Sequence, residues 1–529
     1  MKKTLVSLLL VVCLLCASVS ALADVTPKGT FPVVDAPITL RVAVPVNAKV
    51  EDINTNAYTL FLEEQTGIDL EIIELSESDA ATQINSMMLS GDLPDMFIGY
   101  IFGYDELASY VEAGYIEPLD AYIAEYGDNY YKLKDELKNL IDIDAQSTID
   151  GHIYSVPGIS TAVNNLYSKY KIRIPESFLT NLNMEMPTTL DEFYQYLVAV
   201  RDQDANGNGD PSDEIPMSGS GGKHYLIENI GNAFQYTDGE TYLKLNNGKV
   251  EFIGANEQFR KTVEFMKKLV DEKLLDPAFY TQDKAMVLTL NTQEYPLLGA
   301  DASYTSGNYD SSSELYASLH IIPNLVGPDG YKATRLYIPN VQRCMVITTA
   351  CKEPAAAYRL CDFIIDEYAS VVCRLGIENV HWERLPADTE SIGRDGKAAW
   401  YQTIGVQEWM QPIQNTIWRN ASFINDGLLN HVAEDPNGSL AKLAVDMLKY
   451  NLAEEVTGEQ IPPLLMDPET SIEYNEVKKL VVNYVKENVA KFVLGDRSMD
   501  EWDDYVATLN QIGVDYYVQL SQEAYDAMN

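Results

Sequence analysis

The fold of this chain is decided by three short apolar runs: ITLRVAV at residues 38–44, IDLEII at residues 68–73 and DMFIG at residues 95–99. The first run alternates apolar and polar side chains, as a β-strand does. Helical patterns lie between the runs, at 54–67, where Gly67 is a C-terminal stop signal, and around 84–89. This β-α-β-α-β order predicts an α/β fold with a parallel sheet covered by helices on both faces.

Polar and aromatic residues follow two of these predicted strands. In an open α/β sheet, ligands bind at the carboxyl ends of the strands. We therefore take Asn54, Asn56, Tyr100 and Tyr104 as candidate ligand contacts. The alternatives are helix capping for the two asparagines and core packing for the two tyrosines.

Length and charge narrow the class of protein. A chain of 529 residues is too long for one hydrophobic core, so two or more lobes are expected. The net charge of −41 argues against nucleic acid and anionic lipid as partners. It also disfavours a strongly anionic ligand, unless basic residues gather locally.

Helical patterns dominate the second part of the chain. Capping-box spacings occur at Thr189 with Glu192 and at Ser498 with Glu501. The predicted helices include 256–273, with apolar Phe259, Val263, Phe265, Met266 and Leu269, and later segments near 437–453, 470–490 and 498–510.

The N-terminus has the layout of a secretory signal peptide. It carries Lys2 and Lys3, an apolar run over 5–16, and then Ala21-Leu22-Ala23. The run is too short to span a bilayer, and we expect cleavage after Ala23; an uncut anchor is the alternative. Cys13 and Cys16 follow large residues rather than the small residue that usually precedes a lipidated cysteine, so no lipid anchor is expected.

Four cysteines remain after that cleavage, Cys344, Cys351, Cys361 and Cys373. No C-x-x-C spacing is present among them, which argues against a zinc or redox site. We expect buried thiols, and one disulfide is the alternative outside the cytoplasm.

Several short segments, in their order along the chain, resemble the extracellular solute-binding proteins of ABC importers, in the large group that includes alginate-binding and other oligosaccharide-binding members. The segments are 90–95, 114–119, 150–157, 187–193, 274–279, 376–378 and 513–525. The resemblance implies a helix-rich type II periplasmic-binding-protein fold, in which two lobes close around a ligand cleft by hinge motion. After the signal peptide at 1–23 and a polar, Pro-rich leader at 24–35, it implies lobe I at 36–156 and 335–398, and lobe II at 157–334 and 399–529.

The same resemblance implies a function. The chain would be a secreted, monomeric binding protein that captures a carbohydrate, a neutral oligosaccharide, and delivers it to the transmembrane subunits of an ABC permease. It would not be an enzyme, and no G-x-S-x-G, H-E-x-x-H or P-loop motif occurs. The alternatives are a receptor for a peptide or another solute, and a secreted glycoside hydrolase, since a chain with 79 acidic residues has carboxylates enough for a catalytic pair.

Sugar sites combine flat apolar faces with a few placed polar groups. Five further candidates fit this need, at the lobe crossover and in the return to lobe II that the resemblance implies. They are Tyr154, Trp382, Trp409, Asn415 and Trp418. Core packing is the alternative role for each aromatic residue.

The loop DQDANGNGDPSDE at residues 202–214 has the composition of a calcium site, since Ca²⁺ takes six to eight oxygen ligands. An EF-hand reading starts at Asp202 and puts Asp213 at the twelfth position. A second reading starts at Asp204 and resembles the calcium loop of the solute-binding family. We take the second, with a structural Ca²⁺ ion held by Asp204, Asn206, Asn208, Asp210, Asp213 and Glu214; a flexible acidic surface loop is the alternative.

Overall fold

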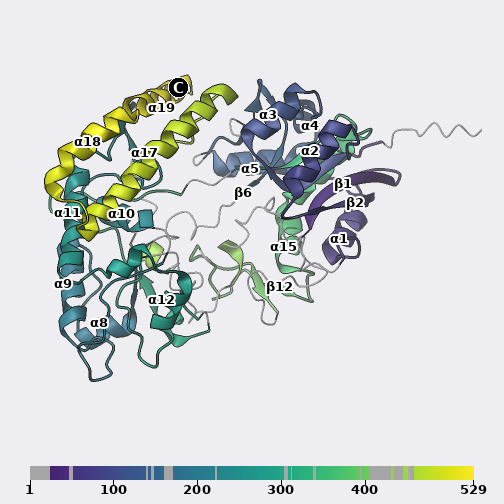
Figure 1. The fold of residues 1–529 in the computed structure, drawn as a ribbon. Coiled ribbons are helices and arrows are strands. Elements are labelled where there is room, and N and C mark those ends of the chain that lie inside the picture. The colour runs from purple at the N-terminus through teal and green to yellow at the C-terminus, as the bar shows by residue number, and fades with distance from the viewer. Residues whose placement is uncertain are drawn as a thin grey trace, which may run out of the picture.

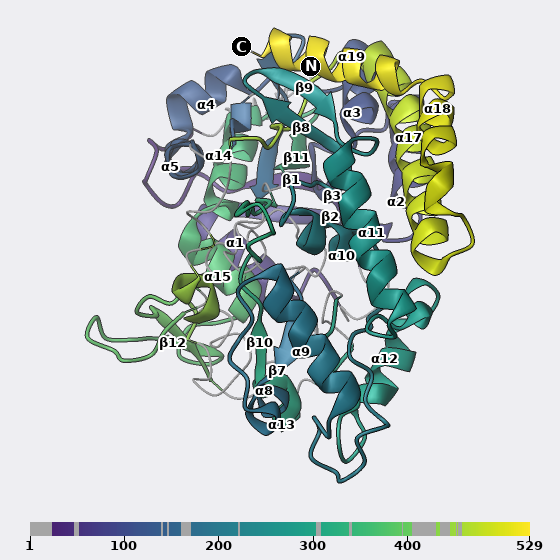
Figure 2. The same ribbon diagram turned by 90° about the vertical axis from the view of Figure 1, so that its left-hand side faces the viewer.

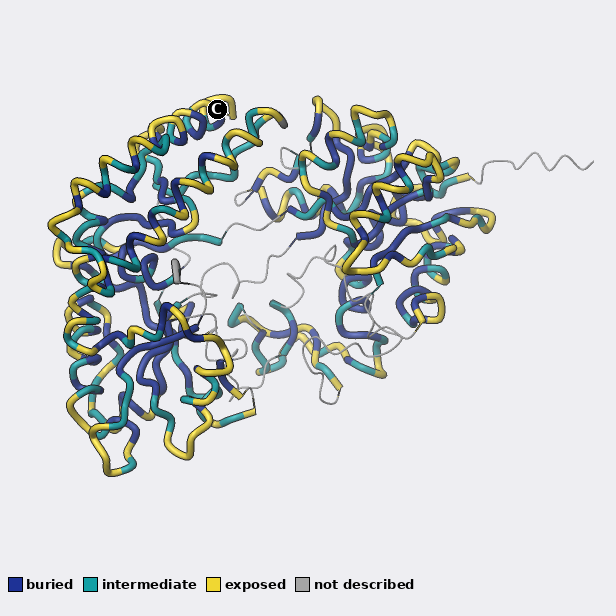
Figure 3. The backbone as a smooth tube through the Cα atoms, viewed as in Figure 1, coloured by how far each residue is buried: buried dark blue, intermediate teal, exposed yellow. Residues whose placement is uncertain are grey.

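The computed structural model describes residues 24–46, 52–138, 141–144, 148–159, 171–220, 223–302, 308–310, 312–337, 341–393, 395–404, 430–433, 445–450, 452 and 458–528. Figure 1 shows two groups of elements, one around β1 to α5 with α15, the other around α8 to α12 with α17 to α19. Each group has its own buried interior, as Figure 3 shows, and the larger hydrophobic clusters divide in the same way. The predicted two-lobe α/β fold is confirmed.

Lobe I is built on a five-stranded sheet of order β2-β1-β3-β11-β6. Its strands are β1 (Ile38–Val46), β2 (Ile68–Ser76), β3 (Met96–Phe102), β6 (Val156–Ile159) and β11 (Val341–Ile347). β1 pairs in parallel with β2 and β3, whereas β11 runs antiparallel to β3 and β6. The strands and the parallel pairing predicted for residues 38–99 are therefore confirmed.

The first helix shows why this local prediction holds. α1 (Ala57–Thr66) begins where the Asn56 side chain accepts a hydrogen bond from the backbone N–H of Tyr58, and it ends at Gly67 in the left-handed region. Asn56 thus takes the capping role that the sequence offered as its alternative. The other lobe I elements are α2 (Ala80–Ser90), α3 (Tyr104–Glu112), α4 (Asp120–Tyr126), α5 (Asp128–Leu137), β4 (Thr148–Ile149), β5 (His152–Ile153), α14 (Pro354–Ile364), α15 (Glu367–Leu375), β12 (Trp382–Arg384) and β13 (Tyr401–Thr403).

Two segments pack differently from the division implied by the family resemblance. Val33 and Val34, in the expected leader, are buried in the lobe I core, and Val33 N–H donates to Thr66. At the other end, Tyr401 and Val432 pack in the same cluster as Trp382, although the return to lobe II is expected at residue 399.

Lobe II contains long amphipathic helices. Its elements are β7 (Arg173–Pro175), α8 (Glu176–Leu182), α9 (Leu190–Asp202), α10 (Lys223–Gly231), β8 (Leu243–Asn246), β9 (Lys249–Phe252), α11 (Glu257–Asp271), a 3-10 turn (Pro277–Tyr280), α12 (Lys284–Asn291), α13 (Glu314–Ala317), β10 (Leu319–Ile321), α17 (Pro468–Leu494), a 3-10 turn (Met499–Glu501), α18 (Trp502–Gln511) and α19 (Val514–Ala527). Figure 2 shows α17 and α18 along one side, beside α11, with α19 across the top of the view. Both predicted capping boxes are present.

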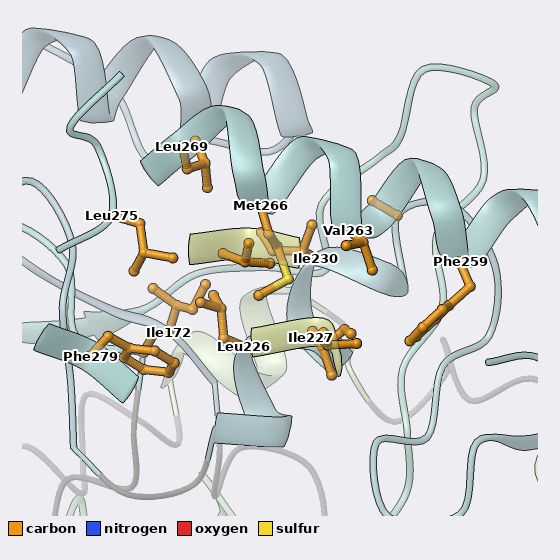
Figure 4. Packing of buried hydrophobic residues seen from close by; sticks show 14 of the residues in the cluster. Ile172, Leu226, Ile227, Ile230, Phe259, Val263, Met266, Leu269, Leu275 and Phe279 are labelled. Atoms are coloured by element: carbon orange, nitrogen blue, oxygen red, sulfur yellow. The ribbon is translucent and has the colours of Figure 1, made fainter. Parts of the chain in front are cut away.

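α11 explains how this lobe holds together. Phe259, Val263 and Met266 recur at helical spacing and are fully buried, and they face Ile227 and Ile230 of α10 (Figure 4). Burying one such side chain stabilises a fold by about 1.5–3 kcal/mol. The helix predicted from this spacing at 256–273 is confirmed as Glu257–Asp271.

Two smaller findings concern membranes and thiols. Within the described part of the chain, no helix has the length and apolarity to cross a bilayer. Cys344, Cys351, Cys361 and Cys373 are all free thiols, and all but Cys351 are buried.

Candidate functional site

The carboxyl ends of three strands meet at one edge of the lobe I sheet. β1, β3 and β6 all point their carboxyl ends to this edge, because β11 runs antiparallel to both β3 and β6. β11 begins at the same edge, where Val341 pairs with Ile159, the last residue of β6. β6 lies between the two groups of elements in Figure 1, so this is the edge at which the chain leaves lobe I and returns to it.

Tyr104 and Arg343 occupy this edge. Tyr104 is the first residue of α3, directly after β3, and Arg343 pairs with Phe102 at the end of β3. The Arg343 guanidinium lies 5.2 Å from the centre of the Tyr104 ring, within the range of a cation–π contact. Both side chains are only partly buried. They therefore bring an aromatic ring and a guanidinium together at one place.

The same place lies next to lobe II. α17 contacts α3, and in Figure 1 the end of α17 reaches toward α3. Burial raises the pKa of Tyr104; Arg343 opposes the rise, and Asp105, Asp467 and Asp150 add to it. Asp467 is the N-cap of α17, so Tyr104 is influenced by groups from both lobes. The Tyr104 edge therefore combines a partly exposed aromatic ring, an arginine and carboxylates from both lobes.

Two other predicted aromatic contacts already have hydroxyl partners. The Tyr100 hydroxyl donates to Glu106, at 3.0 and 3.2 Å from its two carboxylate oxygens. The Tyr154 hydroxyl donates to Asp150 at 3.2 Å, and its side chain is buried. Burial, followed by the neighbouring carboxylate, raises the pKa of each hydroxyl to about 12. These tyrosines are therefore fixed in place, with Tyr100 the more accessible.

The remaining predicted contacts do not join Tyr104. Asn54 is exposed and its side chain donates to Asp52, while Asn56 is buried as a helix cap. Trp382 is fully buried, and its indole N–H donates to the Gly376 carbonyl at 2.6 Å. Its ring packs in the lobe I core, which is the alternative role that the sequence offered for it. Trp409, Asn415 and Trp418 lie outside the described residues.

Sequence reasoning missed a polar group in lobe II. Residues 215–218 and 298–301 form parallel bridges, and polar residues follow their carboxyl ends. The Ser220 hydroxyl donates to Asn308 at 2.8 Å, and the Asn308 amide donates to Asp301 at 3.2 Å. All three side chains are buried. These strand pairings are too short to show as a pattern in the sequence.

The acidic loop is ordered by its own side chains. The Asp204 carboxylate accepts hydrogen bonds from the backbone N–H groups of Gly207, Asn208 and Gly209, at 2.8 to 3.0 Å. The two glycines have positive φ, which lets the backbone curl around Asp204. Asp204 therefore organises the loop.

The end of the loop closes onto its start. Glu214 Oε1 accepts from the backbone N–H groups of Ala205 and Asn206, at 2.7 and 3.1 Å, while its Oε2 is buried without a hydrogen-bond partner. The amides of Asn206 and Asn208 donate to the two oxygens of Asp213.

The outer carboxylates of the loop behave differently. Asp202 pairs with the adjacent Arg201 and is exposed. Asp210 accepts from the backbone and hydroxyl of Ser212, also at the surface. Among the described residues, no three His, Cys, Asp or Glu side chains are arranged to hold a metal ion.

Comparisons with known proteins agree with this architecture. The fructooligosaccharide ABC transporter substrate-binding protein FusA of Streptococcus pneumoniae is 25% identical over 481 residues, covering 88% of this chain and 86% of FusA. The polygalacturonan/rhamnogalacturonan-binding protein YtcQ of Bacillus subtilis is 22% identical, covering 88% of this chain and 87% of YtcQ.

Solved structures show the same fold. FusA in complex with kestose matches with a TM-score of 0.67 at 23% identity, covering 93% of this chain and 99% of FusA. A solute-binding protein of Bifidobacterium longum subsp. infantis matches with a TM-score of 0.72 at 20% identity, covering 93% of this chain and 98% of that one. The family described as bacterial extracellular solute-binding protein matches residues 45–367, which is more than half of the chain, and the chain belongs to that family.

Proposed function

We propose that this protein is the substrate-binding component of an ABC importer, and that it captures an oligosaccharide between its lobes and delivers it to the permease. The observation that carries this is the Tyr104–Arg343 pair, at the edge where the chain crosses between lobes. FusA and YtcQ, which match this chain nearly end to end, carry names of carbohydrate binders. The protein acts as a monomer that binds and releases its ligand unchanged.

The charges around Tyr104 favour a neutral sugar. Asp105, Asp150 and Asp467 all raise the pKa of this tyrosine, whereas Arg343 lowers it. A polyanionic saccharide would meet like charge there, and the net charge of −41 adds to the repulsion. A neutral ring can instead stack on Tyr104 while its hydroxyls accept from Arg343.

A ligand panel tests this function. Melting temperature is followed with kestose, other neutral oligosaccharides and oligogalacturonates. A ligand at roughly 100 times its dissociation constant adds about 2.7 kcal/mol of stability. Tyr104→Ala should raise the Kd roughly tenfold, while Tyr131→Ala, an exposed tyrosine on α5, should not. Release of shorter sugars would indicate a hydrolase, and a response to peptides alone would indicate a peptide receptor.

We also propose that the acidic loop holds a structural Ca²⁺ ion. Glu214 Oε2 is a buried acceptor without a hydrogen-bond partner, as a metal ligand would be before the ion enters. The amides of Asn206 and Asn208 point N–H groups at Asp213, and rotating them by half a turn would present oxygens instead. Asp204 and Asp213 would complete the set of oxygen ligands.

We also propose that the protein is exported from the cell. The family is extracellular, and the first residues have the layout of a signal peptide. The mature protein then begins at Asp24. N-terminal sequencing tests this; a lipid on Cys16 would contradict it, as in a lipoprotein such as the relative LipO of Bacillus subtilis.

A further inference from the structure

The chain returns from lobe II to lobe I between Ala333 and Val341, a stretch that we call the return crossover. Three of its residues, 335–337, are held by hydrogen bonds to lobe II. Just before them, Ala333 N–H donates to the Asn232 carbonyl at 3.0 Å, which ties the chain to lobe II. Residues 335–337 follow, and β11 of the lobe I sheet begins at Val341. Residues 335–337 therefore lie between a point fixed on lobe II and the first residue of a lobe I strand.

Glu228 of α10 accepts hydrogen bonds from two of the three residues, Arg335 and Tyr337. Its Oε1 accepts from Arg335 Nη1 at 2.7 Å and from Gly239 N–H at 3.0 Å, and its Oε2 accepts from the Tyr337 hydroxyl at 2.5 Å. Glu228 is 3% exposed. Because both carboxylate oxygens are engaged, one side chain fixes the crossover at two points.

Gln460 grips the residue between them. The backbone N–H of Leu336 donates to Gln460 Oε1 at 2.9 Å, and Gln460 Nε2 donates to the Leu336 carbonyl at 2.6 Å. Gln460 lies in the segment that leads into α17, the helix that contacts α3 of lobe I. The crossover is thus attached both to α10 and to the segment that leads into α17.

We propose that Glu228, with Gln460, is a positioning residue that clamps the crossover at 335–337 and limits how far the ligand-free lobes open. This rests on the proposed function, in which the lobes close on a ligand. A narrower open state loses less conformational freedom on closing, so the clamp favours binding without touching the ligand.

The chemistry of the clamp makes it sensitive to pH. Burial raises the pKa of Glu228 to about 7, although Arg335 opposes this rise. Below that pH the carboxyl is protonated and its ionic grip on Arg335 weakens. The other ionisable groups around Glu228 and Arg335 are Asp238, Glu240, Tyr337, Tyr236, Tyr242, Glu459 and Lys478.

The effect of Glu228→Gln on the melting temperature distinguishes a positioning role of Glu228 from a role in stabilising the fold. A carboxyl whose pKa is raised in the folded state favours the protonated form, so ionised Glu228 opposes folding above about pH 7. Glu228→Gln resembles the protonated form. It should therefore leave the melting temperature at about pH 8 unchanged or higher, while it loosens the crossover.

The decisive measurement is the distance between the lobes without ligand. Spin labels are placed at Leu60→Cys and Met286→Cys, two exposed positions in different lobes, and the distance distribution is recorded at about pH 8 and about pH 6. In the labelled protein that keeps Glu228, the distance distribution should become broader on acidification. Glu228→Gln should be broad at both values, and the Leu336 amide should exchange roughly fivefold faster, as expected for a weakened hydrogen bond.

Matched variants complete the test. Tyr337→Phe removes one grip and should act in the same direction, whereas Tyr194→Phe removes an equivalent hydroxyl-to-carboxylate bond to Glu272, away from the crossover, and should not. A distribution unchanged in both Glu228→Gln and Tyr337→Phe overturns the proposal. Because no sugar is used, failure to find a carbohydrate ligand would leave this result intact and would count against the proposed function alone.

Discussion

The two readings of the acidic loop make opposite predictions for Asp202→Ala and Glu214→Ala. Asp202 is exposed and pairs with its neighbour Arg201, a contact that contributes at most about 1 kcal/mol at the surface. Glu214 accepts from two backbone N–H groups at 2.7 and 3.1 Å. Hydrogen bonds to a charged group contribute about 1.5–3 kcal/mol each, so Glu214→Ala should destabilise lobe II by about 3 kcal/mol even without metal.

Calcium adds a second, larger difference. Saturating Ca²⁺ at roughly 100 times its dissociation constant adds about 2.7 kcal/mol to the unsubstituted protein. Asp202→Ala should retain this gain, because Asp202 lies outside the contacts that close the loop. Glu214→Ala should lose most of this stabilisation, because the buried Glu214 Oε2, which has no hydrogen-bond partner, is the oxygen that we propose as a calcium ligand.

The assay is thermal unfolding with calcium, with magnesium and with a chelator, supported by metal analysis of undialysed protein. Magnesium should substitute poorly, because it demands near-ideal octahedral geometry. Loss of the calcium response in Asp202→Ala but not in Glu214→Ala would support the EF-hand reading and refute ours. If the unsubstituted protein binds no calcium at all, the loop is a solvated acidic turn.

Three further predictions concern stability. Met266→Ala empties a fully buried position on α11 and should cost about 2–5 kcal/mol in urea unfolding; a loss within error would mean that this core repacks freely. Gly327→Ala places a Cβ 1.7 Å from the Ala233 carbonyl oxygen and should cost about 1–3 kcal/mol or more, and unchanged thermal unfolding would contradict that contact. Burial raises the pKa of Asp362 to about 6, so the unfolding free energy should fall as pH rises from about 4 to about 6. Asp362→Asn should flatten that part of the pH profile, and an unaltered profile would exclude Asp362 as its source.

The local elements could be predicted because their signals are local. The strands over 38–99 and the helix at 257–271 follow from side-chain periodicity within a few residues. Thr189 and Glu192 bond to each other's backbone across three positions, so the capping box is visible in the sequence. Nothing outside these short windows was needed to identify the elements.

The candidate site was only partly predictable, because its pairs are made by tertiary structure. Tyr104 was found from its place after a strand, but its partner Arg343 lies far along the chain, on a strand that inserts beside β3. Trp382 is fully buried in the core, and the sequence could not indicate this because buried cores and sugar sites use the same aromatic residues.

In this acidic chain, which has 38 basic and 79 acidic residues, three arginines connect segments that are far apart in the sequence. Arg335 joins the crossover to α10, Arg343 joins β11 to Tyr104, and Arg359 donates to the carbonyls of Thr26 and Thr30 to hold the N-terminal segment on lobe I. A planar guanidinium offers several fixed donors, which suits a joint between distant segments. Two of the three, Arg335 and Arg359, are largely buried, where salt screens charges far less than at the surface. The excess of carboxylates thus disfavours anionic ligands, while these three arginines hold distant segments in place.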